Sequence, residues 1–253
     1  MKRIIQSVLL FMLAFAGFAI AMVPTHFVVR FIPANIPLQL VGPQGTIWHG
    51  SAENISLKNQ PYGKLEWRLS PLPLLFATLN ADFHLRGEGL EAKGEVTVKR
   101  DQSMMLENTV VNADIARLPL QKANLMVVPE GQAHAVIQSL LFINQKIDRV
   151  DADIHWAPAR ISSPAEYELG EIDLALTGKD GNLEGDLKSQ KGPINARGKL
   201  KVSTTGLLKA DVKLTPTESA PDDLRDMLPM IGRPDSNGTV RIKQQLQIPG
   251  WPA

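Results

Sequence analysis

The sequence predicts a mainly β protein with an N-terminal transmembrane helix. The helix is followed by a long antiparallel, twisted, one-faced β-sheet with a weak internal repeat, and by a short helix near the C-terminus. Three observations carry this prediction. Residues 4–23 are almost wholly apolar, apolar and polar side chains alternate along most segments after Pro37, and glycine-containing turns separate those segments. Alternation with a period of two is typical of strands that bury one face.

The apolar run at residues 4–23 predicts a membrane anchor. Its length matches the about 20 residues that a helix needs to cross a bilayer. Lys2 and Arg3 precede the run, so the N-terminus stays in the cytoplasm and the rest of the chain is exported. The predicted organisation is therefore a cytoplasmic N-terminus (1–3), a single transmembrane helix (4–23), a spacer (24–37) and a periplasmic β domain (38–253).

A cleaved signal peptide is the alternative to this anchor. Ala19-Ile20-Ala21 has the small-residue pattern of a signal-peptidase site. The apolar part of a signal peptide is about 7–15 residues long, and the run in this chain is longer, which favours retention. A mature protein beginning at Met22 would indicate cleavage.

Composition excludes several classes of protein. The chain has 27 Lys and Arg against 26 Asp and Glu, a net charge of +1, so nucleic acid is not an expected partner. It has no cysteine, which excludes disulfides and thiolate zinc sites. The exported part must therefore be held together by an ordinary apolar core.

Alternation defines the predicted strands. Leu65, Trp67 and Leu69 share one face of a segment whose other face is charged, and the same pattern recurs from residue 82 to residue 248. Asp180-Gly181 and Asn237-Gly238 are typical of tight hairpin turns, because both residue types tolerate positive φ. A meander of hairpins with one apolar face follows.

One segment, residues 219–228, predicts a short helix. Ser219 is positioned as an N-cap and Pro221 fits the first turn, while Pro229 and Gly232 are expected to end the helix. Apolar residues recur along it at helical spacing, which predicts that it covers one end of the sheet; docking of a partner is the alternative.

Two tryptophan-centred stretches suggest the internal repeat. Trp67 and Trp156 each end an alternating strand, 89 residues apart, and each is followed by a proline-containing connection and a hairpin. The repeat-like halves span about 38–128 and 129–253, and each would contribute strands to a shared sheet.

The sequence contains no recognisable catalytic, cofactor or metal site. None of the five histidines has the spacing of a helical zinc pair, and those in strands are expected on the solvated face. A G-x-S-x-G nucleophile elbow is missing from the sequence. The glycine-rich stretch 192–199 departs from the phosphate-loop pattern and is interpreted as a turn. We therefore expect no enzyme activity and no cofactor.

The least generic stretch is Gly45-Thr46-Ile47-Trp48-His49-Gly50-Ser51-Ala52. Two glycines bound a large indole, a pattern typical of close backbone approach beside a structural aromatic side chain; ligand stacking is the alternative. The candidate residues for structure or interaction are Trp48, Gly45, Gly50, Trp67 and Trp156.

This stretch, together with Leu65-Glu66-Trp67-Arg68-Leu69-Ser70-Pro71 and Gly232–Val240, resembles the type II secretion system protein N family (GspN). The resemblance implies an accessory, inner-membrane component of the machine that exports folded periplasmic proteins through an outer-membrane secretin. Other inner-membrane components of that system, and the secretin, are the partners it implies. It carries no known catalytic residues.

Two hypotheses of function follow. The first is an anchored, non-catalytic secretion component whose strand edges pair with other subunits. The second is an AsmA-like periplasmic protein that binds a lipid acyl chain on its apolar sheet face, an analogy at the level of fold. Small residues on that face, including Ala81, Gly94, Ala152 and Gly185, motivate the second hypothesis.

Overall fold

The computed structural model describes residues 11–12, 15, 22–25, 38–57, 60–118, 128–144, 146–163 and 166–248. The chain divides into two compact units, residues 1–88 and 89–253, referred to below as unit 1 and unit 2. Most of the predicted membrane segment lies outside the described residues. Among those that are described, no helix combines the length and the apolar character that crossing a bilayer requires.

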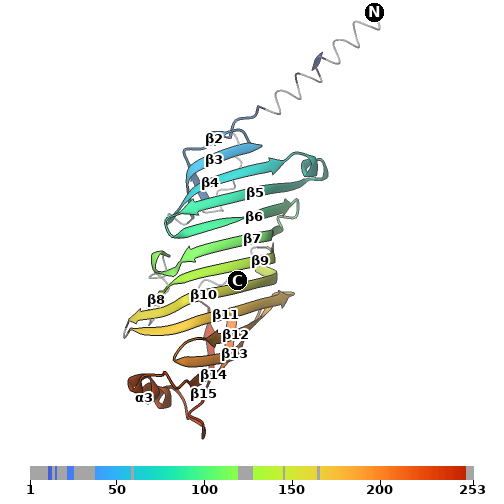
Figure 1. Ribbon diagram of the computed structural model, residues 1–253. Helices are drawn as coiled ribbons and strands as arrows, with labels where there is room; N and C mark the ends of the chain where they lie inside the picture. The colour runs from blue at the N-terminus through green and yellow to red at the C-terminus, as the bar shows by residue number, and fades with distance from the viewer. Residues whose placement is uncertain are drawn as a thin grey trace, which may run out of the picture. The chain divides into compact units, whose positions relative to one another are not determined.

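Unit 1 is built of antiparallel strands (Figure 1). Its hydrogen-bonded order is β1-β3-β4-β5, and β2 pairs with β3. The elements are β1 (Leu38–Val41), β2 (Gln44–Gly45), β3 (His49–Leu57), β4 (Gln60–Ser70), the 3₁₀ helix η1 (Leu72–Phe76) and β5 (Thr78–Gly87).

In unit 2 the strands follow one another in nearly sequential order, β6-β7-β9-β10-β11-β12-β13-β14-β15, and β8 pairs with β10. Its elements are β6 (Leu90–Lys99), β7 (Met104–Asp114), the 3₁₀ helix η2 (Ile115–Arg117), β8 (Val128–Glu130), β9 (Gln132–Ile143), β10 (Lys146–Ser163), β11 (Tyr167–Lys179), β12 (Asn182–Gln190), β13 (Ile194–Val202), β14 (Leu207–Pro216), α3 (Asp222–Ile231) and β15 (Val240–Gln247).

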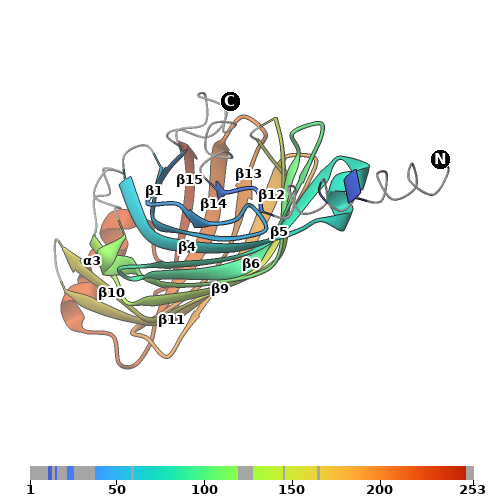
Figure 2. The same ribbon diagram turned by 90° about the horizontal axis from the view of Figure 1, so that it is seen from above.

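The main features of the predicted fold are confirmed: the chain is mainly β, its strands are antiparallel, and one short helix lies near the C-terminus. The predicted turns at Asp180-Gly181 and Asn237-Gly238 both form, with Gly181 at φ 75° and Gly238 at φ 73°. Within unit 2 the sheet is strongly twisted, since β13–β15 run steeply across the direction of β9–β11 (Figure 2).

Cross-strand register aligns the apolar residues of unit 2 into rungs on one face. One rung joins Ile154 of β10 to Leu174 of β11 and Leu187 of β12. A neighbouring rung joins Ala152 and Leu176. Val150, Ala152 and Leu183 form a buried cluster, whereas larger side chains such as Leu174 and Leu187 stay half-buried. The apolar face predicted from period two is therefore present, and it is only partly covered.

The helix α3 differs from its prediction at both ends. It begins after Pro221, which is the N-cap, and Ser219 does not cap it. The hydroxyl of Ser219 instead pairs with that of Thr217 (2.9 Å), and Arg225 reaches back to the carbonyl oxygen of Ala220 (2.9 Å). Pro229 lies inside the helix, which continues to Ile231 although a proline there cannot donate a backbone hydrogen bond.

Burial of α3 is concentrated on one side. Leu224 and Leu228 are buried, as is Val240 at the start of β15, against which the helix packs. Met230, two residues after Leu228, is 84% exposed. The apolar stripe that predicts the helix therefore faces the last strand of unit 2.

We expect Leu228→Ala to destabilise unit 2 by about 2–5 kcal/mol, because it leaves a cavity between α3 and β15. Met230→Ala, on the same helix but exposed, is the matched control and should change stability by less than about 0.5 kcal/mol. Urea unfolding of the full chain followed by circular dichroism measures both. Equal losses for the two variants would contradict this account of α3.

Candidate functional site

The motif 45–52 forms a tight connection between β2 and β3. Gly45 pairs with Gly50, and the amide of Thr46 donates to the carbonyl of His49 (2.9 Å). Gly45 has φ 83°, and a Cβ on it would lie 2.5 Å from the carbonyl oxygen of His49. Only glycine fits this conformation at such a distance. The motif therefore folds as a turn in which Gly45 permits close approach of the backbone at His49.

Trp67 of β4 packs onto this turn. Its indole Nε1–H donates to the carbonyl of Ile47 (3.1 Å). A Cβ on Gly50 would lie 2.3 Å from Cζ2 of the indole, so the ring occupies the space that any other side chain at residue 50 would need. Trp48, half-buried within the turn, accepts a hydrogen bond from the amide of Leu69 through its carbonyl (2.8 Å). The structure thus brings together four of the five predicted residues, Gly45, Trp48, Gly50 and Trp67.

The fifth residue, Trp156, lies in unit 2 and makes the same type of contact. Its Nε1–H donates to the carbonyl of Glu130 (2.9 Å), beside Gly131, whose φ is 119°. The next strand supplies an apolar partner to each tryptophan: Phe83 opposite Trp67 and Ile172 opposite Trp156, 16 residues later in both cases. The two tryptophans thus have similar surroundings, in line with the predicted internal repeat. The boundaries of that repeat stay a prediction.

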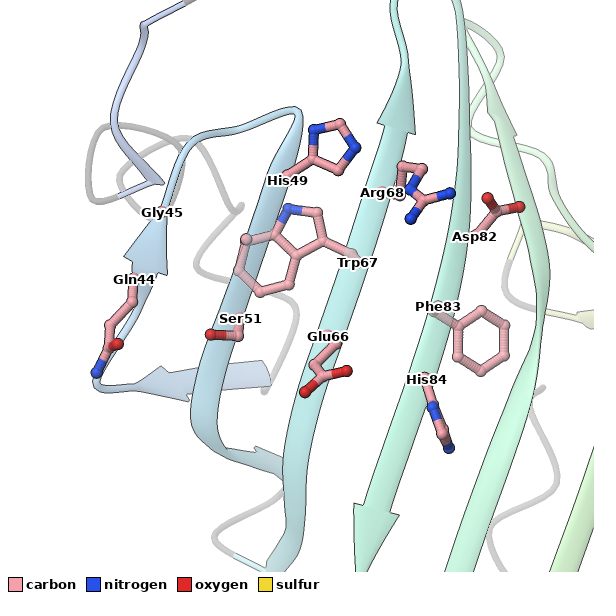
Figure 3. Close-up of a pocket in the computed structure, with 11 residues that line it drawn as sticks. Gln44, Gly45, His49, Ser51, Glu66, Trp67, Arg68, Asp82, Phe83 and His84 are labelled. Atoms are coloured by element: carbon pink, nitrogen blue, oxygen red, sulfur yellow. The ribbon is translucent and has the colours of Figure 1, made fainter.

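An open depression of about 660 Å³ surrounds the turn on unit 1 (Figure 3). Gly45, Gly50 and Trp67 line it, with polar side chains that the sequence analysis did not single out. Two rungs supply these side chains: Ser51, Glu66 and His84, and next to them His49, Arg68 and Asp82. Strand alternation places both sets of side chains on one face of the sheet. Knowing that β4 pairs with β5 would therefore have identified these polar residues as neighbours.

The geometry of these rungs does not match a nucleophile site. Ser51 and His84 lie on strands separated by β4, hence about 10 Å apart, whereas a serine and its base need to be about 2.6–3.2 Å apart. Lys64 donates to Glu66 (2.7 Å), and this hydrogen bond lowers the pKa of the Glu66 carboxyl. The ammonium group of Lys64 therefore neutralises the Glu66 carboxylate.

Charged residues on the polar face of unit 2 are paired in the same way. The Arg241 guanidinium binds Asp211 through two hydrogen bonds (2.7 and 2.6 Å), which lower the pKa of the Asp211 carboxyl. His155 Nδ1 lies 2.7 Å from Asp173, and the pKa of that carboxyl is lowered mainly by this hydrogen bond. Both pairs are solvent-exposed cross-strand pairs of the kind that adds little to stability.

A second, smaller depression of about 440 Å³ lies on unit 2 between the ends of β10 and β11 and the start of α3. The hydroxyl of Tyr167 donates to Asp223 there (3.0 Å), which raises the pKa of the tyrosine. In the described part of the chain, no three His, Asp or Glu side chains are grouped to hold a metal ion. His49, His134 and His155 are exposed on strands, as predicted, whereas His84 on β5 is half-buried. His26 lies outside the described residues.

The family model described as "Type II secretion system (T2SS), protein N" matches residues 37–243. The chain belongs to the type II secretion system protein N family. Its predicted resemblance to that family is confirmed. The matched range contains the turn at 45–50, both depressions and most of the described strands, so the family match covers the β part of the chain.

Two curated members of the family align along nearly the whole chain. The type II secretion system protein N of Aeromonas hydrophila is 26% identical over 256 residues, covering 98% of this chain and all of the relative. That of Vibrio cholerae serotype O1 is 22% identical over 260 residues, with the same coverage. No solved structure matches the chain.

We expect Gly50→Ala to destabilise unit 1 by about 1–3 kcal/mol, because the added methyl group displaces the Trp67 indole and its hydrogen bond to Ile47. In a Trp67→Ala background the same substitution should destabilise unit 1 clearly less, because the indole that the methyl group would displace is absent. The control is Gly185→Ala in β12, whose new methyl group would meet the flexible ends of Leu174 and Leu176 at 3.1 Å and Cβ of Leu200 at an ordinary contact distance of 3.4 Å. Thermal unfolding of the four-variant cycle measures the coupling. Additive losses would rule out the proposed packing of the indole on Gly50.

Proposed function

We propose that the protein is a non-catalytic accessory component of the type II secretion system, anchored in the inner membrane by residues 4–23. Its N-terminus lies in the cytoplasm and its β units in the periplasm. There it assembles with other inner-membrane components and the secretin to support export of folded periplasmic proteins. Membership of the family supports the system assignment. The role within the system is argued from the outer edge of β15, which has no ladder partner in the described part of the chain.

The strand β15 ends the sheet of unit 2. Among the described residues its ladder partner is β14, and on its other side Val240 alone is bridged, by Pro234. The amide of Ile248 donates to Gly206 at the end of the β14 side. Backbone groups alternate along a strand, so those of Lys243, Gln245 and Gln247 point away from β14. This outward row is available to a strand from another protein, which is β-augmentation.

The described part of the N-terminal segment supports the anchor. Phe11, Met12 and Phe15 are helical and are 64–71% exposed, and the two phenylalanine rings stack at 6.4 Å between centroids. Large apolar side chains so exposed in a helix suit contact with lipid. They agree with the length of the apolar run.

Replacing Gln245 by proline should lower cargo secretion several-fold in a strain that lacks the chromosomal copy. Proline removes one outward N–H while leaving the ladder with β14 intact, as edge strands tolerate. Gln245→Ala keeps the N–H and should secrete like the wild type. Secreted cargo and the amount of membrane-associated protein are measured together by immunoblotting.

A complementary variant checks the direction of the backbone groups. Gln244→Pro removes an inward N–H and should reduce the amount of folded protein, unlike Gln245→Pro. Normal secretion by Gln245→Pro would argue against docking at the β15 edge. Normal secretion after deletion of the whole gene would refute the proposed function itself.

Lipid binding is a second candidate, favoured by the half-buried rung Ile154, Leu174 and Leu187 on the apolar face of unit 2. Gly94, one of the small residues of that face, does not itself provide space, because a Cβ on it would lie 2.1 Å from Oγ1 of Thr109. The lipid-binding hypothesis therefore rests on the large, half-buried side chains of Ile154, Leu174 and Leu187.

Native mass spectrometry of the detergent-purified full chain tests it. We expect a retained phospholipid that is lost in Leu187→Asp, because a carboxylate on this face must be desolvated against an acyl chain. Lys188→Gln, the neighbouring residue on the opposite face, should retain it. A wild-type chain free of lipid would eliminate the candidate.

A further inference from the structure

The connection between β4 and β5 exposes a compact group of large apolar side chains. Leu72, Leu75 and Phe76 in η1 are 72%, 79% and 84% exposed. Leu74 and Leu79 are exposed to a lesser degree, 39% and 38%. Single exposed apolar residues are ordinary on a protein surface, but several together at the tip of one loop indicate an interaction site. We call this group, residues 72–79, the apolar loop.

Charge and backbone chemistry both set the apolar loop apart. From Leu69 to Ala81 the chain carries no charged residue, in a protein where 21% of residues are charged. Pro71 and Pro73 have no amide N–H, and the amide of Ala77 donates to the carbonyl of Leu74 (3.0 Å). The amide of Leu74 is bonded locally as well, to the carbonyl of Pro71 (3.3 Å). A segment with these properties suits the low-dielectric boundary of a bilayer.

Hydrogen bonds fasten the end of the predicted anchor close to the apolar loop. The carbonyl of Val23 accepts from the amide of Ile47 (3.1 Å), and Pro24 is bridged to Thr46. The hydroxyl of Thr25, which is buried, donates to the carbonyl of Gln44 (3.1 Å). The chain that leaves the predicted membrane segment therefore docks directly on the β2–β3 turn.

The same turn holds the end of β4. Trp48, next to Ile47, accepts from the amide of Leu69, three residues before Leu72. Val23 and Leu69 thus lie two strand spacings apart, about 10 Å. The apolar loop begins beside the point where the anchor ends, and all of these contacts are within unit 1.

We propose that the apolar loop inserts into the interfacial region of the periplasmic leaflet beside the anchor, as a second membrane contact of unit 1. The occupant is lipid, because the hydrogen bonds from residues 23–25 bring the loop to the level at which the anchor leaves the bilayer. Phe76 and the leucines enter the acyl boundary, and Arg68, exposed at the base of the loop, lies at the level of the head groups. This inference rests on the proposed anchor at residues 4–23.

The lack of native cysteine allows a direct test. The full-length protein carrying Phe76→Cys is labelled with an environment-sensitive fluorophore and reconstituted into vesicles of phosphatidylethanolamine and phosphatidylglycerol. We expect blue-shifted emission, strong quenching by nitroxide-labelled lipid and weak quenching by aqueous iodide. Lys64→Cys is the matched control: it lies on the same strand, β4, about 20 Å from its loop end. It should show the reverse pattern.

Each result bears on a different part of the proposal. If the protein floats with the vesicles but the label at residue 76 is quenched by iodide as at residue 64, the loop is in water, and the inference is overturned while the anchor stands. The loop would then be open to a protein partner. Two measurements test the anchor alone: membrane extraction with alkaline carbonate, and the mass of the mature protein from cells. A soluble chain beginning at Met22 would overturn the proposed anchor. It would also overturn the placement of the loop, which rests on that anchor.

Discussion

The structure depends on antiparallel hydrogen bonding between strands that are neighbours in sequence. In unit 2 each strand from β9 to β14 pairs with the strand that follows it. Short connections fix the register of these pairs as far as β14, whereas the longer connection to β15 contains α3. A shift of one residue would move every apolar side chain to the wet face. The rungs of leucine, isoleucine and alanine, the cross-strand ion pairs and the placement of the tryptophans all follow from this register.

The register also explains why the site around the β2–β3 turn is open and polar. Gly45 and Gly50 let two backbones approach, and the indole of Trp67 covers the gap that they leave. Charged residues of β3, β4 and β5 then fall in rows on the opposite side of the pleat. Lys64 hydrogen-bonds Glu66, and Arg68 lies opposite Asp82, so opposite charges are close to one another on this face.

Much of this architecture was predictable from turn residues and from the alternation of apolar and polar residues. Each regular strand with one apolar face shows this alternation in its sequence. Strand β7 was harder to recognise. Its Asn108 has φ 48° and forms a bulge, since residues 108 and 109 together oppose Gly94 of β6. A bulge inserts one residue and reverses the alternation, so the pattern on either side falls out of phase.

The candidate site was predictable only in part, for a related reason. The glycines and Trp67 have local signatures, but the polar rungs depend on which residues of β4 and β5 face each other. That pairing is set by the length of the loop between Ser70 and Asn80, which alternation does not reveal. The start of α3 escaped prediction because Ser219 had a closer hydroxyl partner in Thr217.

The edge of β15 has a consequence for the behaviour of the protein when it is alone. A row of unpaired backbone groups is a hazard, because two copies can join edge to edge and grow into aggregates. Here α3 and the Pro234 bridge cover one end of the strand, and Lys243 stands near the middle of the remainder. Antiparallel pairing centred there would place this lysine against its own copy, and such like-charge contact is unfavourable. The edge that we propose as the docking site of a foreign strand is thus protected against self-association.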